Sequence, residues 1–360
     1  MGEKVLMKGN EAIAEAAIQA GCRHYFGYPI TPQTELAAYM AKRMPKIGGV
    51  FLQAESEVAA INMVYGVAGT GKRVMTSSSS PGISLKQEGI SYIAGADLPA
   101  LIVNVQRGGP GLGGIQPSQS DYFQATKGGG HGDYRLIVLA PASVQEMADL
   151  TIKGFDLSEK YLVPTMLLAD GTMGQMMEPV ELPEVPASTV EMPWAVTGTQ
   201  CKRKHNIINS LYLNPEKLEQ KNYERYERYA QIEENECMWE SFMMDDAEYC
   251  VVAFGIAARV SKNAVVAARK EGIKVGLIRP ITLWPFPKKA LAEAADHVKA
   301  FVSVELSMGQ MIEDVKLATE CRKPVTLCNR TGGMIPSPDE VLDSIRKATK
   351  GEYYSRLLFL

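Results

Sequence analysis

The sequence lacks any uninterrupted apolar run near the roughly 18 residues that a membrane-spanning helix needs. Its start, Met1 to Lys4, does not open the apolar segment that a signal peptide contains. It also lacks a charge bias, because 38 lysine and arginine residues nearly balance 41 aspartate and glutamate residues. A near-neutral chain is not typical of proteins that bind nucleic acids or membrane surfaces. We therefore expect a cytoplasmic protein with neither kind of partner.

Cysteine is scarce and scattered. No two of the six cysteines stand two residues apart in the manner that zinc and iron–sulfur ligands favour. A disulfide framework is not expected either, because a chain of 360 residues in a reducing compartment does not need one. We therefore expect this chain to hold no metal ion and no cluster. The cysteines are Cys22, Cys201, Cys237, Cys250, Cys321 and Cys328.

Two glycine-rich segments resemble nucleotide-binding loops but lack the right context. The segment 66–73 (GVAGTGKR) has the outline of a Walker A loop, yet Arg73 stands where that loop needs a serine or threonine for magnesium. Gly109, Gly111 and Gly114 fit a G-x-G-x-x-G pattern, but the residues after them do not open the helix that a dinucleotide site requires. We expect no nucleotide site at either place. The sequence also has no G-D-G followed at a distance by asparagine, the signature of a magnesium-diphosphate site.

Length and composition favour two domains of the α/β class. A chain of 360 residues with 46% apolar and 22% charged residues can bury more than one core. Over residues 1–178, strand-like and helix-like segments alternate, as they do in an open parallel sheet. The alternation returns over 248–360, which predicts a second and smaller parallel-sheet domain. Between them, 179–247 reads as a linker and a charged helical segment.

The predicted linker begins with a cluster of prolines, which favours an extended chain. The charged part that follows, 215–244, fits one long helix with three tyrosines on a single face. We interpret this face as a packing surface. The prolines are Pro179, Pro183, Pro186 and Pro193, and the tyrosines are Tyr223, Tyr226 and Tyr229.

Polar side chains follow several of the predicted strands of the first domain. Thr31 follows the strand 24–28, and Arg107 follows the strand 100–105. A serine-rich turn, 77–82 (SSSSPG), follows a third strand. Ligands of an open parallel sheet bind outside the carboxyl ends of its strands, so these side chains are expected at one edge.

Glu57, which follows the predicted strand 50–53, is the most diagnostic of these residues. Helical spacing places it on the apolar stripe of the helix 56–68, with Ala60, Ile61, Val64 and Ala68. A carboxylate on a covered face is costly unless it is protonated or paired, which favours a functional role. A capping or salt-bridging role is the alternative. Glu55 lies off the stripe and is expected to be an ordinary carboxylate of the first turn.

The other two residues also have structural alternatives. The guanidinium fork of Arg107 beside a glycine-rich loop suits a substrate carboxylate, but it also suits a buried structural cation. Thr31 suits a substrate contact, and it also suits the N-cap of the following helix.

Taken together, five segments resemble the pyrimidine-binding domain of the 2-oxoacid:ferredoxin oxidoreductase family, in family order and spacing. The resemblance extends over nearly the whole chain, with a second domain similar to the transketolase C-terminal domain. The segments are 27–32 (GYPITP), 55–57 (ESE), the serine-rich turn, 103–110 (VNVQRGGP) and 130–133 (GHGD).

The resemblance implies roles for individual residues. Glu57 would hydrogen-bond the ring nitrogen of the aminopyrimidine of thiamine diphosphate, promoting the tautomer that removes the proton from the thiazolium C2. Arg107 and Thr31 would orient the substrate carboxylate. Pro29, Ile30 and Ser80 would line the cofactor pocket, and His131 receives no role.

The resemblance also implies a reaction and partners. A 2-oxoacid would be decarboxylated oxidatively with coenzyme A, giving an acyl-CoA, carbon dioxide and reduced ferredoxin. Since this chain lacks a diphosphate signature and cluster ligands, a β subunit would hold the diphosphate and Mg²⁺. Iron–sulfur clusters would lie in a ferredoxin-like subunit, with a γ subunit completing the complex.

The loop 111–121 resembles members that act on branched-chain 2-oxoacids, so the favoured substrate is 3-methyl-2-oxobutanoate. Three alternatives stay open at this point. The chain could serve a 2-oxoglutarate enzyme, a thiamine-dependent decarboxylase or synthase without electron transfer, or a scaffold without activity. Cluster-bearing partners would distinguish the first two, and Glu57 argues against the third.

Overall fold

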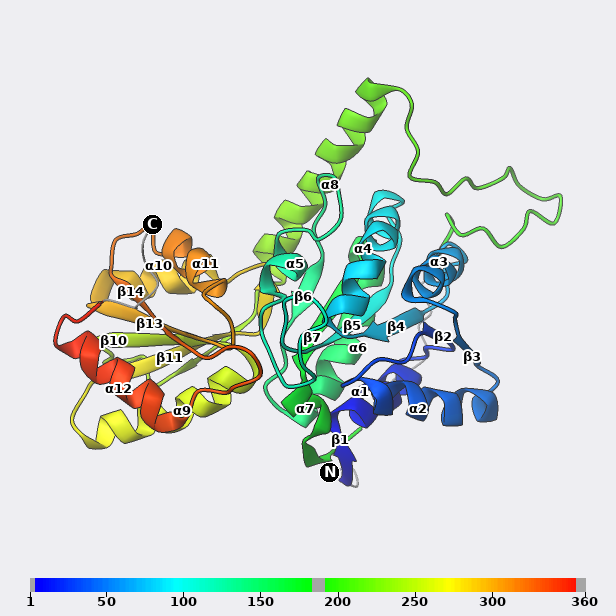
Figure 1. The fold of residues 1–360 in the computed structure, drawn as a ribbon. Helices are drawn as coiled ribbons and strands as arrows, with labels where there is room; N and C mark the ends of the chain where they lie inside the picture. Colours follow the sequence, from blue (N-terminus) through cyan, green and yellow to red (C-terminus); the bar gives the residue numbers. More distant parts are fainter. Residues whose placement is uncertain (1–3, 183–191, 354–360) are drawn as a thin grey trace.

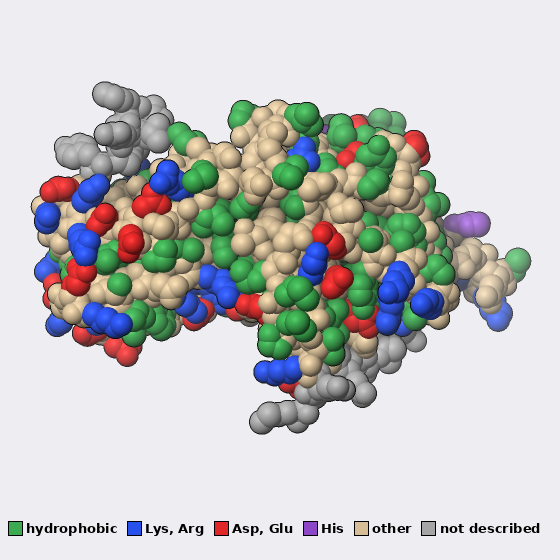
Figure 2. All heavy atoms as spheres, turned by 60° about the horizontal axis from the view of Figure 1, so that its bottom comes forward, with side chains coloured by type: hydrophobic (Ala, Val, Ile, Leu, Met, Phe, Trp, Pro, Cys, Tyr) green, Lys and Arg blue, Asp and Glu red, His purple; other side chains and the backbone are tan. Residues whose placement is uncertain are grey.

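A computed structural model describes residues 4–182 and 192–353 of the chain. Pro183 and Pro186 of the predicted linker lie outside these residues. Figure 1 shows two α/β units side by side, from which the long helix α8 projects. On the face in Figure 2, basic and acidic side chains are interspersed, as the balanced composition predicts. No described helix has both the length and the apolar character that crossing a membrane requires.

The first unit is built on a sheet of seven described strands. Its strand order is β12-β6-β7-β5-β4-β2-β3, and every neighbouring pair is parallel except β12 and β6. The core strands are buried and rich in apolar residues, as parallel strands covered on both faces must be. The strands are β2 (His24–Gly27), β3 (Val50–Gln53), β4 (Val74–Ser78), β5 (Leu101–Gln106), β6 (Ile137–Leu139), β7 (Thr165–Asp170) and β12 (Thr282–Trp284).

Helices cover both faces of this sheet (Figure 1). The first of two groups packs α1 against α2 and α6, and the second packs α3 against α4. A small antiparallel pair, β1 (Val5–Lys8) with β8 (Met177–Val180), closes the unit. The helices are α1 (Gly9–Gln19), α2 (Thr34–Arg43), α3 (Glu57–Ala68), α4 (Ser80–Gly95), α5 (Tyr122–Thr126), α6 (Val144–Tyr161) and α7 (Gly171–Gln175).

The second unit has a smaller sheet of five described strands in the order β14-β13-β10-β11-β9. Four strands are parallel, and β9 runs antiparallel to β11. The strands are β9 (Trp239–Phe242), β10 (Tyr249–Ala253), β11 (Val275–Pro280), β13 (Ala300–Glu305) and β14 (Val325–Asn329), and the helices are α9 (Gly255–Lys270), α10 (Lys288–His297), α11 (Met311–Ala318) and α12 (Pro338–Thr349). The predicted α/β class with two parallel-dominated sheets is confirmed. The domain limits at 178 and 247 stay a prediction.

The long helix predicted over 215–244 is too long. The helix α8 is Pro215–Asn235, and β9 follows it. Tertiary pairing overrides helix propensity here, because Met238 O accepts hydrogen bonds from Ile281 N and Thr282 N, and Met238 N donates to Thr282 Oγ1. Of the three tyrosines, only Tyr229 is buried, with its ring 5.6 Å from that of Trp284.

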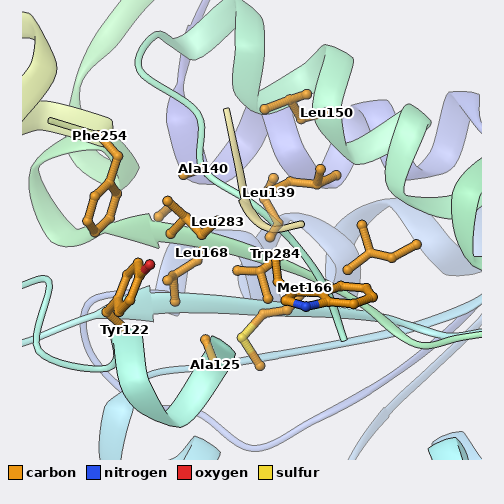
Figure 3. Packing of buried hydrophobic residues seen from close by; sticks show 14 of the residues in the cluster. Tyr122, Ala125, Leu139, Ala140, Leu150, Met166, Leu168, Phe254, Leu283 and Trp284 are labelled. Atoms are coloured by element: carbon orange, nitrogen blue, oxygen red, sulfur yellow. The ribbon is translucent and has the colours of Figure 1, made fainter. Parts of the chain in front are cut away.

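The two units share one continuous apolar core. The rings of Tyr122 and Phe254, one from each unit, lie 5.9 Å apart, and Leu283 and Trp284 of β12 pack among residues of the first sheet (Figure 3). Gln119 ties the units with hydrogen bonds to backbone groups of Phe254 and Leu306.

Candidate active site

The carboxyl ends of β2, β3, β4 and β5 bring most of the predicted site residues to one edge of the first sheet. Arg107 Nη1 donates to the carbonyl oxygen of Thr31 at 3.1 Å, and Arg107 N donates to Ser80 Oγ at 3.0 Å. Pro29 is exposed and Ile30 half-buried on the segment that precedes Thr31. Thr31 does not take the alternative role of helix N-cap, because the N-cap of α2 is Gln33.

Glu57 is the first residue of α3 and is only 6% exposed. Ser56 caps the helix by accepting from Ala59 N, which sets Glu57 at the start of the buried stripe that the helical spacing predicts. Among the described residues, none donates a hydrogen bond to its carboxylate. Glu55 is exposed and lies ahead of the N-cap, so its predicted place in the first turn is wrong.

The carboxylate of Glu57 lies directly against the backbone of Gly82 in the first turn of α4. A Cβ atom on Gly82 would come within 2.6 Å of Glu57 Oε1 and 2.2 Å of Ser78 Oγ. Only glycine therefore fits here without displacing a polar atom. The hydroxyls of Ser78 and Ser79 are buried and have no hydrogen-bond partner in the described part of the chain. The segment 77–82 is not one turn, since β4 runs to Ser78 and α4 begins at Ser80.

Lys86, which the sequence interpretation did not select, is fully buried one helical turn after Gly82. Its Nζ donates to Thr76 Oγ1 at 2.6 Å and to the carbonyl oxygen of Ser77 at 3.1 Å. Burial lowers the pKa of the Lys86 ammonium to about 7, while the charge of Glu57 opposes that change. The sequence did indicate that Lys86 is buried, because helical spacing places it on the apolar stripe of α4, between Ile83 and Ile90.

A chain of hydrogen bonds extends from the same strand toward the first loop. Tyr25 Oη lies 2.7 Å from Ser77 Oγ, and Ser77 Oγ donates to Gln33 Oε1 at 2.6 Å. Gln33 Nε2 in turn donates to the carbonyl oxygen of Tyr28 at 3.2 Å. This chain fixes the backbone that leads into Pro29.

The guanidinium of Arg107 connects two loops of the edge. It is 7% exposed, and besides Thr31 it donates through Nη2 to the carbonyl oxygen of Leu112 at 3.0 Å. Its Nε is buried without a partner among the described residues. Arg107 therefore has a structural function in this conformation, while one donor stays unused.

Ser80 is held from the opposite side by a buried acid. Its hydroxyl donates to Asp121 Oδ2 at 2.6 Å, and Asn104 Nδ2 donates to the same oxygen at 2.8 Å. Burial raises the pKa of the Asp121 carboxyl. This group borders a pocket of about 330 Å³ between the units, lined by Ser80, Asp121, Gly108, Gly111, Gln310 and Thr331 among others.

His131 lies away from this edge. It is exposed, its Nδ1 is 3.4 Å from Ser91 Oγ, and its ring meets that of Tyr92 edge-on. Within the described residues, no group of three or more histidine, cysteine, aspartate or glutamate side chains could hold a metal ion.

Comparison with known protein families identifies the two units. Residues 15–242 match the family described as "Pyruvate flavodoxin/ferredoxin oxidoreductase, thiamine diP-bdg", and 247–341 match "Pyruvate:ferredoxin oxidoreductase core domain II". The chain belongs to the 2-oxoacid:ferredoxin oxidoreductase family. Its first unit is thus the thiamine-diphosphate-binding domain of that family, and the predicted family is confirmed.

Relatives agree in sequence and in structure. The chain is 53% identical over 343 residues to ketoisovalerate oxidoreductase subunit VorB of Methanothermobacter thermautotrophicus, covering 95% of this chain and 97% of that one. It is 37% identical over 378 residues to 2-oxoglutarate synthase subunit KorA of Methanothermobacter marburgensis, covering 96% and 99%. A solved 2-oxoglutarate:ferredoxin oxidoreductase from Magnetococcus marinus matches with a TM-score of 0.84 at 26% identity.

The match to the Magnetococcus enzyme covers 96% of this chain and 65% of that chain. A split-gene transketolase matches with a TM-score of 0.59 at 13% identity, which shows the shared fold alone. The relatives are named as subunits of oxidoreductases, so members of this family act in multi-subunit complexes. The predicted enzyme class, an oxidoreductase acting on 2-oxoacids, is confirmed.

Proposed function

We propose that this chain is the α subunit of an oxidoreductase that converts 3-methyl-2-oxobutanoate and coenzyme A to an acyl-CoA, carbon dioxide and reduced ferredoxin. The buried Glu57 carboxylate, unpaired at the strand-end edge of a thiamine-binding domain, carries the proposal for the reaction class. The substrate rests on the 53% identical relative, which is named a ketoisovalerate oxidoreductase subunit.

The residues at the edge fit the aminopyrimidine half of thiamine diphosphate. A buried carboxylate without a hydrogen-bond donor and the two buried, unpartnered hydroxyls of Ser78 and Ser79 offer polar atoms that complement those of the aminopyrimidine. When bound, the cofactor supplies a thiazolium carbon that adds to the 2-oxo carbon and stores the electrons left by decarboxylation. Glu57 would accept a hydrogen bond from the ring nitrogen of the pyrimidine.

We assign the remaining residues as follows. Arg107 would donate to the substrate carboxylate through Nε, which has no partner among the described residues, or through a terminal nitrogen after it leaves its present carbonyl acceptor. Thr31 stands on the loop that Arg107 already contacts, so its hydroxyl would reach the same carboxylate. Pro29, Ile30 and Ser80 would line the cofactor pocket, with Ser80 acting mainly through the bonds that fix Arg107.

The partners complete what this chain lacks. We propose a β subunit that binds the diphosphate with Mg²⁺, a ferredoxin-like subunit that carries the iron–sulfur clusters, and a γ subunit. Ferredoxin would accept the electrons and coenzyme A the acyl group. The cytoplasmic location stays a prediction from the sequence.

A second substrate is favoured by a specific observation. Several relatives at 35–37% identity are named 2-oxoglutarate synthase subunits, and the matching structure contains bound 2-oxoglutarate. The 2-oxoglutarate relatives are less similar to this chain than the ketoisovalerate relative, at 53% identity, so 2-oxoglutarate is the second candidate.

The test is to isolate the complex anaerobically from its own host and follow coenzyme A-dependent viologen reduction with 3-methyl-2-oxobutanoate, 2-oxoglutarate and pyruvate. Glu57→Ala is expected to abolish reduction in an assembled complex, and the matched variant Glu55→Ala, at an exposed site two residues away, is expected to leave it unchanged. Preference for 2-oxoglutarate would favour the second substrate. Reduction that survives Glu57→Ala, or no reduction with any 2-oxoacid, would contradict the proposal.

A further inference from the structure

A lysine with no exposed surface lies beneath the carboxylate that we assign to the cofactor. The hydrocarbon stem of Lys86 is enclosed in the core of the first unit, and its Nζ uses two of three donors on Thr76 Oγ1 and the Ser77 carbonyl. Lysine is rarely buried in this way, because desolvation of the ammonium is costly without a compensating charge. The position therefore requires an explanation other than packing.

Helix geometry connects Lys86 to Glu57. Gly82 contacts the Glu57 carboxylate and Gly89 contacts Ile61, so α3 and α4 meet along a row of small residues. Lys86 lies between these two glycines on α4, four residues after Gly82 and on the same face. The backbone of Lys86 is thus one helical turn from the point where the carboxylate touches α4, and its ammonium lies on Thr76 and Ser77, the residues of β4 just before Ser78.

The charges around Lys86 are few. From α3, Glu57 is the charged group on the buried stripe, where its neighbours are Ala60, Ile61 and Val64. The strand β4 contributes two neutral acceptors, the Thr76 hydroxyl and the Ser77 carbonyl. Glu57 is the group whose charge favours the ammonium form.

We propose that Lys86 is a positioning residue that acts through Glu57. Its buried positive charge would weaken the binding of the proton that the Glu57 carboxylate and the aminopyrimidine share. The proposal rests on the proposed function of Glu57. A nearby cation stabilises the more negative of two protonation states, so the pair loses its proton at a lower pH with Lys86 charged than without it. With Lys86 charged, the carboxylate form of Glu57, which would accept a hydrogen bond from the ring nitrogen of a bound aminopyrimidine, would be favoured.

The charge of Lys86 is expected to change with pH near neutrality. Since burial lowers the pKa of Lys86 to about 7, its charge is present below that pH and is lost as the pH rises through it. The effect of Lys86 on the pair is therefore largest at and below neutral pH. Loss of the Thr76 hydroxyl, an acceptor for Nζ, is expected to weaken the charged form and act in the same direction.

The experiment measures exchange of the thiazolium C2 hydrogen with deuterium in the assembled complex, after an acid quench, between about pH 5.5 and 8.5, together with thiamine diphosphate binding by calorimetry. In Lys86→Met, the cofactor is expected to bind within about threefold of wild type, and the pH of half-maximal exchange is expected to rise by about one unit. In a Glu57→Gln background, adding Lys86→Met is expected to change exchange by less than about twofold, because the residue acts through the carboxylate.

Thr76→Val is the second variant and carries the test alone if Lys86→Met does not assemble; it is expected to shift the profile upward by a smaller amount. A profile equal to wild type in either assembled variant, or an equal shift in the Glu57→Gln background, would overturn the role of Lys86. If the wild-type complex itself neither binds thiamine diphosphate nor exchanges the hydrogen, the proposed function fails instead.

Discussion

The Oε1 atom of Glu57 lies 2.6 Å from the point where a Cβ atom would stand on Gly82. Glu57 and Gly82 belong to different helices, α3 and α4, so the position of the carboxylate depends on how these helices pack. A methyl group at residue 82 must displace the carboxylate or separate the helices. The geometry of the candidate site is therefore sensitive to a single carbon atom on a residue with no functional group.

Gly82→Ala is expected to reduce turnover by about 100-fold or more while the complex still assembles, since small misplacements of reacting groups have effects of this size. Viologen reduction and thiamine diphosphate binding provide the measurement. Gly66→Ala on α3 is the matched control, because a Cβ atom there meets nothing within 4 Å. Full activity in Gly82→Ala would show that the carboxylate does not need this contact.

Arg107→Lys is expected to lower kcat/KM for the 2-oxoacid by about 100-fold, because lysine cannot reproduce a planar fork that donates to two carbonyls and would, in the role proposed for it, also bind the substrate carboxylate. Arg107→Met is expected to abolish turnover while assembly is retained. Steady-state kinetics with varied 2-oxoacid, alongside size-exclusion chromatography of each variant, check both expectations. An unchanged KM and kcat in Arg107→Met would remove Arg107 from the substrate site.

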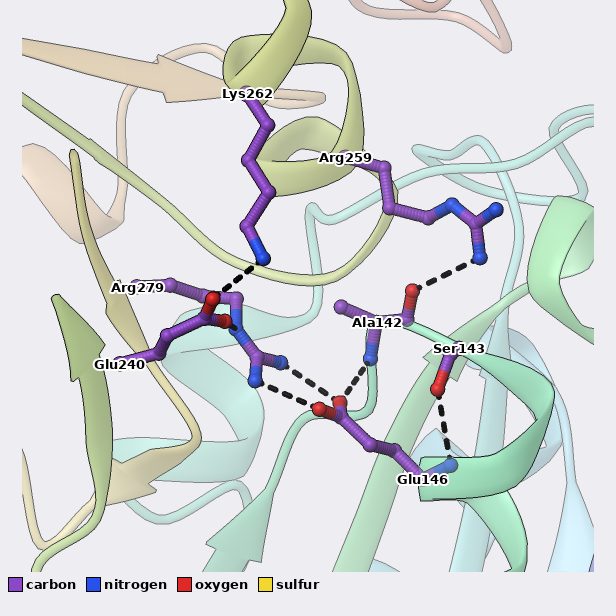
Figure 4. Close-up of polar contacts among 7 residues, drawn as sticks. All are labelled: Ala142, Ser143, Glu146, Glu240, Arg259, Lys262 and Arg279. Atoms are coloured by element: carbon purple, nitrogen blue, oxygen red, sulfur yellow. Dashed lines mark hydrogen bonds and ion pairs between the residues drawn. The ribbon is translucent and has the colours of Figure 1, made fainter. Parts of the chain in front are cut away.

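Arg279 joins the two units through a buried guanidinium. It donates to both oxygens of Glu146 at 2.7 Å and to Glu240 Oε2 at 2.8 Å, and Lys262 and Ala142 complete the cluster (Figure 4). Arg279→Met is expected to lower the free energy of unfolding by about 2 kcal/mol, because two partly covered carboxylates lose the guanidinium and keep only Lys262 and the Ala142 N–H as partners among the described residues.

The matched control for Arg279 is Arg346→Met. Arg346 pairs with Glu271 on the surface, where solvent screens the two charges, so its replacement is expected to destabilise the protein less than that of Arg279. Urea unfolding of both variants, followed by circular dichroism, gives the comparison. Equal losses in the two variants would mean that the contact between the units does not depend on Arg279.

The thiols are expected to differ sharply in reactivity. Burial raises the pKa of Cys22 and of Cys250 to about 12, so both stay protonated when the pH rises from about 7 to about 9. Cys321 is exposed, so it is expected to be alkylated faster than either buried thiol. Mass spectrometry after iodoacetamide treatment of the folded complex measures this. Alkylation of Cys22 as fast as Cys321 before unfolding would contradict the described burial.

The sequence predicted best where a periodic pattern determines the geometry. The stripe of α3 placed Glu57 correctly because helical spacing alone decides which side chains are covered. The strand-end rule likewise brought Thr31, Ser80 and Arg107 to one edge. These are consequences of local order and sheet topology, and they need no knowledge of side-chain contacts.

The sequence did not predict contacts that depend on the tertiary path of loops. Nothing in the pattern indicated that Arg107 binds the carbonyl of Thr31 and not a side chain, or that Ser80 is held by Asp121. The strand-end rule selects only residues that follow strands, so it could not indicate Lys86, which lies inside a helix. The end of α8 was missed because the pairing of β9 with a distant strand is invisible to helix propensity.

The placement of β12 has a practical consequence for anyone who divides the gene. Thr282–Trp284 comes from the C-terminal part of the chain, yet it forms the outer strand of the N-terminal sheet by pairing with β6. In a fragment that stops near residue 247, β6 (Ile137–Leu139) would become an exposed, apolar edge strand, which could pair with the same strand of another copy. Such a fragment is expected to precipitate on expression, and co-expression of the C-terminal piece is expected to restore it to solution.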